Sequence, residues 1–160
     1  MSDSTPDMTG PSGRQDTAAR LRNLTTRLLS LASIHSDRLV NEELARADAR
    51  KWHYAVLATL DEFGPASQAG LSRRTGIYRG DMVTVINELA DRGLVERSPN
   101  PADRRQNVIT VTEQGHRQLL TLDKILSQVQ DQTLAPLTTP EREQLARLLT
   151  ALVDHHDQSM

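Results

Sequence analysis

The chain has 160 residues, of which 37% are hydrophobic and only 2% aromatic, so we expect one domain, with or without an accessory element, whose aliphatic core favours helices. The absence of cysteine excludes a disulfide framework, a Cys-ligated zinc site and a thiol nucleophile, and it suits a reducing cytosol. The formal net charge of −2 conceals two stretches of opposite charge. Residues 71–107 are basic, with seven arginines against five acids, and residues 108–160 are acidic, with four basic residues against seven acids.

The N-terminal part has a polar tail followed by a helical segment. Residues 1–15 are rich in Ser, Thr, Pro and Gly, which predicts a disordered tail. They lack the features of a secretory signal, and no run approaches the roughly 18 apolar residues of a membrane span, so we expect a cytoplasmic protein. From near Asp16, apolar residues recur at alternating intervals of three and four, as in a heptad seam that needs a partner helix. The seam comprises Leu21, Leu24, Leu28, Leu31 and His35, and residues 41–50 are expected to form a short helix or a bent connection.

The middle of the chain is predicted to hold three helices. The first spans residues 51–63 and ends at a Gly-Pro pair. Ser67 is placed to cap the second, over residues 68–75, because its hydroxyl can accept a bond from a free amide of the first turn. Gly76 then allows a tight turn into the third helix, over residues 79–92.

A β-hairpin follows these helices. Two strand-like runs, residues 94–98 and 107–112, flank a loop with Pro99, Pro101 and a charged tip. Three helices followed by such a hairpin, here called the wing, are typical of a winged helix-turn-helix lobe over residues 51–112. In that lobe the helix over residues 79–92 enters the major groove of DNA.

The C-terminal part, residues 113–157, is predicted to be helical again. Pro136 and Pro140 bound a break, and the last helix starts near Glu141. Apolar residues keep helical spacing on both sides of this break, at Leu119, Leu122, Leu126, Val129, Leu145, Leu148, Leu149 and Leu152.

Two groups of residues are candidates for reading DNA. The predicted helix over residues 79–92 exposes side chains that can reach base edges or phosphates, and Val83 can contact a thymine methyl group. At the wing tip, Arg104 and Arg105 can approach the narrow minor groove, with the Asp103 carboxylate holding Arg105 by a charge-assisted bond. The alternative is that both groups are ordinary solvated surface. The helix candidates are Arg79, Asp81, Thr84 and Asn87.

These residues resemble a known family. The similarity extends over about residues 20–157, and its most specific part is Arg-Gly-Leu-Val-Glu-Arg at 92–97, the proline-containing loop, Asp103-Arg104-Arg105 and Thr112-Glu113-Gln114-Gly115. This combination is similar to the MarR family of bacterial transcriptional regulators. Further matching positions are Tyr54-Ala55-Val56-Leu57, Gly64-Pro65, Leu71, Gly76, Met82-Val83, Leu89 and Thr110-Val111.

The resemblance implies a mainly α fold with a small β wing. It implies a homodimer whose N-terminal helix, within residues 16–50, interdigitates with the C-terminal helices of residues 113–157. The family pattern makes Arg105 the wing arginine that enters the minor groove, with Asp103 as its support. Members generally repress genes from pseudo-palindromic operators, and many release DNA when a small aromatic or phenolic molecule binds. This chain departs from the pattern at Tyr78, where the helix lacks its usual capping residue, and at Gly80 and Asp81, so operator preference cannot be transferred.

The full set of candidate site residues follows from these points. We expect no cofactor, no metal site and no enzymatic activity, since no catalytic or nucleotide-binding motif is present. Two other functions stay open: a winged-helix module that binds protein and a small helical enzyme. Binding by the protein-binding module should depend only weakly on salt concentration, whereas DNA binding should depend on it steeply. Candidate effector-pocket residues are His35, Trp52, His53 and Tyr54, and candidate DNA-binding residues are Arg73, Arg74, Arg79, Gly80, Asp81, Val83, Thr84, Asn87, Arg97, Asp103, Arg104 and Arg105.

Overall fold

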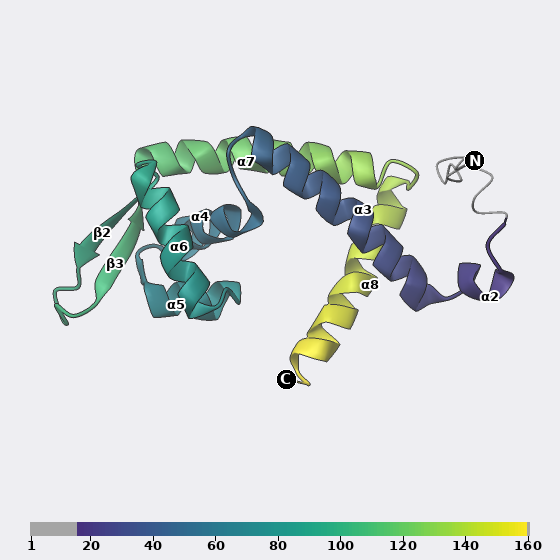
Figure 1. Cartoon of the computed structure of the whole chain (residues 1–160), viewed down its shortest axis with the longest axis horizontal. Coiled ribbons are helices and arrows are strands. Elements are labelled where there is room, and N and C mark those ends of the chain that lie inside the picture. Colours follow the sequence, from purple (N-terminus) through teal and green to yellow (C-terminus); the bar gives the residue numbers. More distant parts are fainter. Residues whose placement is uncertain (1–15, 160) are drawn as a thin grey trace, which may run out of the picture. The chain divides into compact units, whose positions relative to one another are not determined.

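The computed structural model describes residues 16–159, and the tail predicted over residues 1–15 lies outside this range. The chain divides into two units between Arg38 and Leu39. The predicted order of helices, hairpin and helices is confirmed, and the fold is mainly helical with a small wing (Figure 1). The elements are α2 (Ala19–Arg22), α3 (Thr25–Arg46), α4 (Lys51–Phe63), β1 (Ala66–Ser67), α5 (Gln68–Thr75), α6 (Arg79–Asp91), β2 (Val95–Pro99), β3 (Asn107–Val111), α7 (Glu113–Thr133) and α8 (Thr139–Asp157).

The N-terminal seam lies on two helices instead of the single one predicted. Helix α2 ends at Arg22. Its C-cap is Asn23, whose N–H bonds back to the carbonyl of Ala19, and α3 begins at Thr25. Asn and Thr are weak helix formers, because an Asn side chain competes for backbone bonds and Thr loses side-chain freedom, which explains the break. Helix α3 then runs to Arg46, so most of the stretch predicted as a connection is helical. The leucines of the seam are all exposed, by 38–48%.

The core of the second unit is aliphatic. Helices α4 and α5 have the predicted bounds, and α6 ends one residue earlier than predicted. Each helix buries one apolar stripe against the others and against the sheet, as an amphipathic surface helix must. The completely buried side chains include Leu57 and Leu60 of α4, Leu71 of α5, Met82, Ile86 and Leu89 of α6, Ile109 of β3 and Leu122 of α7.

The wing belongs to a three-stranded antiparallel sheet in the order β1-β3-β2. In the hairpin Arg97 pairs with Ile109, and on the other side of β3 Ala66 pairs with the same Ile109. Strand β1 was missed in the sequence, because two residues after a Gly-Pro pair give no alternation to detect. Its pairing holds the N-terminus of α5 against the base of the wing.

Helices α7 and α8 both start with a side-chain cap. The Thr112 hydroxyl accepts from Gly115 N–H at 3.0 Å, and Thr138 forms a reciprocal capping box with Glu141. Helix α8 begins two residues before the predicted start, because Pro140 is tolerated in the first turn of a helix, where its missing N–H has no partner to lose. Over the described range, no helix is long and apolar enough to cross a membrane.

Candidate nucleic-acid interface

The turn between α5 and α6 sets the position of α6, the helix predicted to enter the major groove and here called the recognition helix. Ser67 caps α5 by accepting from Gly70 N–H at 3.0 Å, as expected from the sequence. Gly76 follows α5 in the left-handed conformation with φ of 74°, which glycine adopts without steric cost. Leu71 and Ile77, on either side of this turn, are buried in the common core. Helix α5 therefore braces the first turn of α6, as the helix-turn-helix arrangement requires.

Helix α6 divides into a buried face and an exposed face. Met82, Val85, Ile86 and Leu89 are completely buried. The outer face holds every residue that the sequence singled out on this helix, so the predicted assignment of faces is confirmed. The exposed candidates are Arg79, Gly80, Asp81, Val83, Thr84 and Asn87.

The tip of the wing is a tightly bonded loop. Asn100 N–H donates to Gln106 C=O at 2.9 Å, which closes the loop at its base. The Asp103 carboxylate accepts from the backbone N–H of Arg105 at 3.0 Å. The predicted bond from Asp103 to the Arg105 guanidinium is therefore replaced by an Asx turn, in which the short side chain reaches the amide two residues on. Asp103 shapes the backbone beneath Arg105, and Arg104 lies exposed beside it.

A polar cavity joins the wing to both helices of the motif. Its volume is about 310 Å³, and it brings Arg79 and Arg105 together although they are 26 positions apart in the sequence. Pairing of β1 with β3 creates this juxtaposition, so its other residues were missed when the chain was read as a helix and a separate hairpin. They are Ser67, Gln68 and Ala69 before and in α5, and Gln106 and Asn107 of the wing.

The remaining cationic candidates have neighbours that hold them in place. The Arg97 guanidinium on β2 donates to the side-chain oxygen of Asn87 on α6. Arg74 lies over the ring of Phe63 with 3.8 Å between the guanidinium carbon and the ring centroid, a cation–π contact. Arg73 is exposed beside it. Two of these three arginines, Arg74 and Arg97, are thus tied to neighbouring elements of the lobe.

The C-terminal half of α6 is anchored to the turn between α3 and α4. The Glu88 carboxylate accepts from the Arg50 guanidinium and from His53 Nε2, the latter at 2.6 Å. The other ring nitrogen of His53 accepts the N–H of Arg50 at 3.0 Å, so the imidazole is neutral with its proton on Nε2. Burial lowers the pKa of His53, and the bond from Arg50 lowers the pKa of Glu88. Nearby, Arg92 donates to the carbonyl of Asp48 at 2.6 Å.

The four effector-pocket candidates have different surroundings. Trp52 lines a cavity of about 380 Å³ together with Asn41, Ala45, Ala49, Arg50 and Lys51. His53 lines another, of about 500 Å³, which shares Ala45, Ala49 and Arg50 with the first. The Tyr54 hydroxyl donates to Asp123 at 2.7 Å, a bond that raises the pKa of the phenol. His35 is exposed on α3, with Nδ1 at 3.4 Å from the Arg38 guanidinium. Within residues 16–159, no three His, Asp or Glu side chains are grouped to hold a metal ion.

Comparison with known proteins gives consistent matches. The sequence model described as "MarR family" matches residues 48–106. The HTH-type transcriptional repressor NicR of Pseudomonas putida is 30% identical over 101 residues, which are 63% of this chain and 64% of NicR. The match to this curated relative thus spans slightly less than two thirds of its length.

Solved structures extend the likeness beyond the lobe. BpsR of Bordetella bronchiseptica, whose structure concerns regulation of its DNA binding by 6-hydroxynicotinic acid, gives a TM-score of 0.74 at 23% identity, over 86% of this chain and 99% of BpsR. A mutant MarR from E. coli complexed with operator DNA gives 0.69 at 25% identity, over 79% of this chain and 91% of that one. The helix-turn-helix, the wing and these matches agree: residues 48–106 form a lobe of the MarR family, and the fold of the chain is like that of MarR DNA-binding transcriptional regulators.

Proposed function

We propose that this chain is a homodimeric repressor that binds a pseudo-palindromic DNA operator in the cytoplasm. The observation that carries the proposal is the cavity shared by α5, α6 and the wing, where Arg79 and Arg105 converge. Guanidinium groups recognise phosphates and the electronegative minor groove, and this cavity brings two of them together between a braced helix and a wing. The exposed first turns of α6 then read base edges in the major groove, while Arg105 enters the adjacent minor groove.

Phosphate contacts supply the affinity in this proposal. Arg73, Arg74 and Arg97 surround the lobe, and the contacts of Arg74 with Phe63 and of Arg97 with Asn87 reduce the side-chain entropy lost on binding. Arg104 adds a further charge at the wing tip. Sequence choice rests on Asp81, Val83, Thr84 and Asn87, whose side chains face outward. Asp81 favours a cytosine amino group and disfavours a phosphate.

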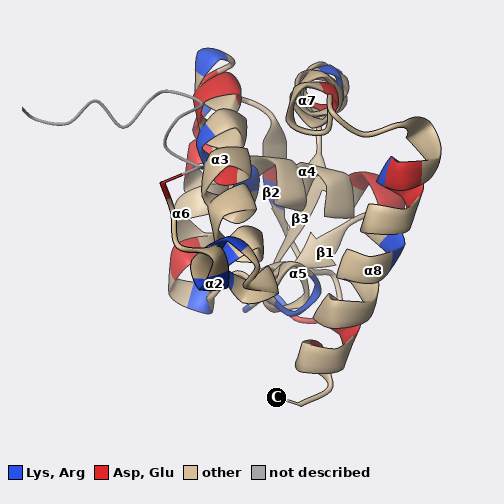
Figure 2. Cartoon of the chain, turned by 90° about the vertical axis from the view of Figure 1, so that its right-hand side faces the viewer, with Lys and Arg blue, Asp and Glu red and all other residues tan. Residues whose placement is uncertain are grey.

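The partner that forms the dimer is a second copy of the chain. Helix α8 has no buried residue although it carries an apolar stripe. The exposed fractions of its large apolar side chains, at Leu148, Leu149, Leu152 and Val153, are 36–57%. No charged residue interrupts the helix between Arg147 and Asp154 (Figure 2). In the first unit, the leucine seam of α2 and α3 is exposed in the same way. Apolar helical stripes of this length mark association surfaces, and a two-fold dimer would place two lobes on successive half-sites.

We also propose control by a small aromatic acid or phenol at the turn between α3 and α4. The cavity at Trp52 combines an apolar floor, Ala45 and Ala49, with two cations, Arg50 and Lys51, which suits an aromatic ring bearing a carboxylate. His53 lies in the adjoining cavity. Tyr54 stays a candidate for the same pocket, although its hydroxyl already bonds Asp123.

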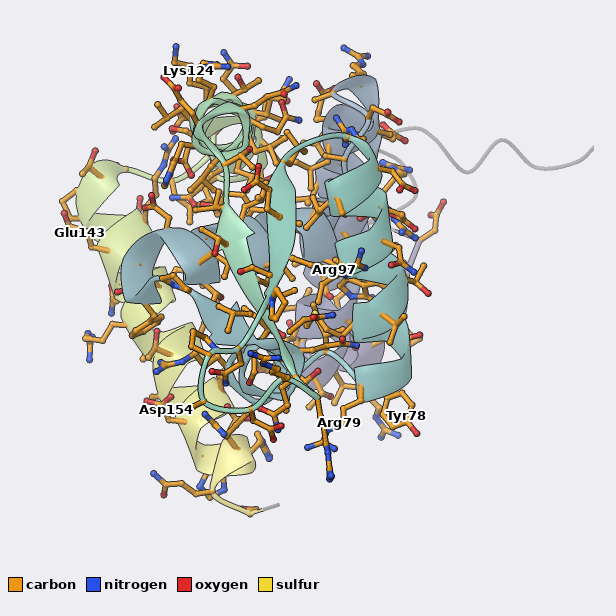
Figure 3. The ribbon with its side chains drawn as sticks, turned by 90° about the vertical axis from the view of Figure 1, so that its left-hand side faces the viewer. Tyr78, Arg79, Arg97, Lys124, Glu143 and Asp154 are labelled. Atoms are coloured by element: carbon orange, nitrogen blue, oxygen red, sulfur yellow. The ribbon has the colours of Figure 1, made fainter. Side chains whose placement is uncertain are left out.

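The experiment that tests the proposal is a salt titration with a duplex selected from a random-sequence library by the wild-type protein, here called the selected duplex. The logarithm of the affinity should fall steeply with the logarithm of salt concentration, by about 0.9 for each phosphate neutralised. Arg105→Ala should weaken binding by about tenfold, the loss expected for a guanidinium contact, and leave the dimer intact. Lys124→Ala is the matched control, because Lys124 lies at the end of the unit opposite to Arg79 (Figure 3).

Two outcomes would contradict the proposal. A shallow salt dependence with no preference for the selected duplex over a scrambled one would favour the alternative module that binds protein. An Arg105→Ala variant with wild-type affinity would remove the wing from the interface. Repression is tested separately, by placing the selected duplex over a promoter and measuring expression of a reporter gene with and without the protein.

A further inference from the structure

The start of α6 gives up local stability at two nearby positions, 78 and 80. Tyr78 is the N-cap and makes no side-chain capping bond, whereas Ser67, Thr112 and Thr138 each cap their own helices. Two positions on, Gly80 lies in the first turn with helical backbone dihedrals, so its conformation does not require glycine. A missing cap costs about 1 kcal/mol relative to a capping residue. A glycine inside a helix costs about 1 kcal/mol relative to alanine. Departures of this kind from local preference are expected where a function needs them.

The two residues are in contact. A Cβ atom on Gly80 would lie 3.2 Å from Cε1 and 3.4 Å from Cδ1 of the Tyr78 ring, so the ring occupies the space beside the helix that a side chain would otherwise take. Despite this contact Tyr78 is 77% exposed, the highest value among the exposed large hydrophobic residues of the described range. The ring thus lies along the first turn of α6, and most of the side chain is open to solvent or a ligand.

The direction of this side chain matters for DNA binding. In Figure 3, Tyr78 and Arg79 project from the same end of α6, beyond the ribbon. Arg79 lines the cavity that it shares with Arg105 of the wing. Tyr78 therefore extends the proposed DNA-facing surface past the first residue of the recognition helix. The apolar faces assigned to the dimer lie on other helices, so dimer formation does not explain the exposed ring.

We propose that Tyr78 is a further DNA-contacting residue, whose hydroxyl donates a hydrogen bond to a backbone phosphate at the edge of the major groove entered by α6. This inference rests on the proposed function. A phenolic hydroxyl is a donor on a rigid ring with only two rotatable bonds, so it loses little entropy when it binds. Gly80 keeps the ring against the helix, and a larger residue there displaces it. The contact adds no charge to the interface.

The test compares three variants on the selected duplex at one salt concentration. Tyr78→Phe removes only the hydroxyl, and we expect about fivefold or greater loss of affinity, since hydrogen bonds to charged groups are the stronger ones. Tyr78→Ala should lose at least as much, and Gly80→Ala should lose affinity through displacement of an unchanged ring. Leu120→Ala, which also truncates a strongly exposed side chain but on α7, is the control. Thermal unfolding of each variant shows that the fold is retained.

Phosphate replacement locates the contact. Single phosphates of the selected duplex are replaced by neutral methylphosphonates, and one position should weaken the wild-type protein but not Tyr78→Phe. That result supports the inference. If Tyr78→Phe and Tyr78→Ala bind within twofold of wild type while Arg105→Ala is weakened, Tyr78 does not contact DNA and the proposed function stands. If the wild-type protein itself prefers no duplex, the proposed function fails, and this inference fails with it.

Discussion

Glu88 connects the recognition helix to the turn between α3 and α4, and Glu88→Ala removes that connection. The carboxylate accepts a bond from His53 Nε2 at 2.6 Å and also bonds the Arg50 guanidinium. His53 is 5% exposed, so after the substitution a largely buried N–H has lost the acceptor that Glu88 supplied. Arg50 is half exposed and can turn to water instead. Loss of the Glu88 carboxylate therefore costs much more free energy at His53 than at Arg50.

The magnitude follows from this difference in burial. A buried donor left without a partner costs about 1–3 kcal/mol, whereas an ion pair with one half-exposed member contributes about 0–1 kcal/mol. We expect Glu88→Ala to lower the free energy of unfolding by about 2–3 kcal/mol near pH 7, most of it from His53. Glu88→Gln keeps an acceptor for His53 and should lose less than half as much. Urea unfolding at a fixed protein concentration measures both values.

The pH dependence provides a second readout. Because the pKa of His53 is lowered in the folded protein, the unfolded chain binds the proton more readily. The stabilisation is therefore complete above the unfolded pKa of 6.5 and is lost as pH falls below it toward the folded pKa. Glu88 adds stability above its own unfolded pKa of 4.5, which is lost as pH falls through its lowered folded value.

Variants assign the pH dependence to His53. His53→Gln, which retains a donor and an acceptor but does not titrate, should flatten the curve of stability between pH 6.5 and 5. Glu88→Ala should steepen it, since burial then acts on His53 without the opposing carboxylate. Equal stability of wild type and Glu88→Ala, together with an unchanged slope in His53→Gln, would refute the reasoning.

Three other variants give contrasting expectations. A Cβ on Gly115 would lie 2.1 Å from the Leu94 carbonyl oxygen, so Gly115→Ala must move the backbone. We expect this variant to destabilise the fold by about 1–3 kcal/mol or more. An unchanged melting temperature would contradict this. The added methyl group of Gly80→Ala meets only the movable Tyr78 ring, and the substitution gains helix propensity. Thermal unfolding should therefore show stability that is equal to wild type or up to about 1 kcal/mol greater. A clear loss of stability would show that the ring cannot move aside. Leu148→Glu with Leu152→Glu should shift sedimentation from dimer to monomer, and a persistent dimer would place the interface elsewhere.

The parts of the fold that the sequence predicted are those with strong local signals. The bounds of α4 and α5 follow from a Gly-Pro stop, the Ser67 cap and the Gly76 turn, each of which acts within a few residues. Strand β1 and the break at Asn23 were not predicted. The first depends on pairing with a distant strand, and the second on weak propensities that a regular leucine spacing concealed.

The candidate site shows the same division. Exposure of the polar residues on α6 follows from helical periodicity and was predicted correctly. The cavity that unites Arg79 with Arg105 depends on sheet pairing, so Gln68 and Asn107 had no signal of their own. Asp103 was expected to hold the Arg105 side chain, but the nearer backbone amide competes for the carboxylate. Glu88 carried no motif at all, because its partners lie 35 and 38 positions away.

Helix α6 is held differently at its two ends, and this difference has a functional consequence. At the C-terminal half, Glu88 and Arg92 bind the turn between α3 and α4, while the apolar stripe is completely buried. At the N-terminus the cap is absent and the side chains are exposed. Arg50, which binds Glu88, also lines both cavities at that turn. A carboxylate ligand bound at Arg50 would compete with Glu88 for the same guanidinium, so this side chain connects the proposed effector pocket to the anchored end of the helix proposed to read DNA.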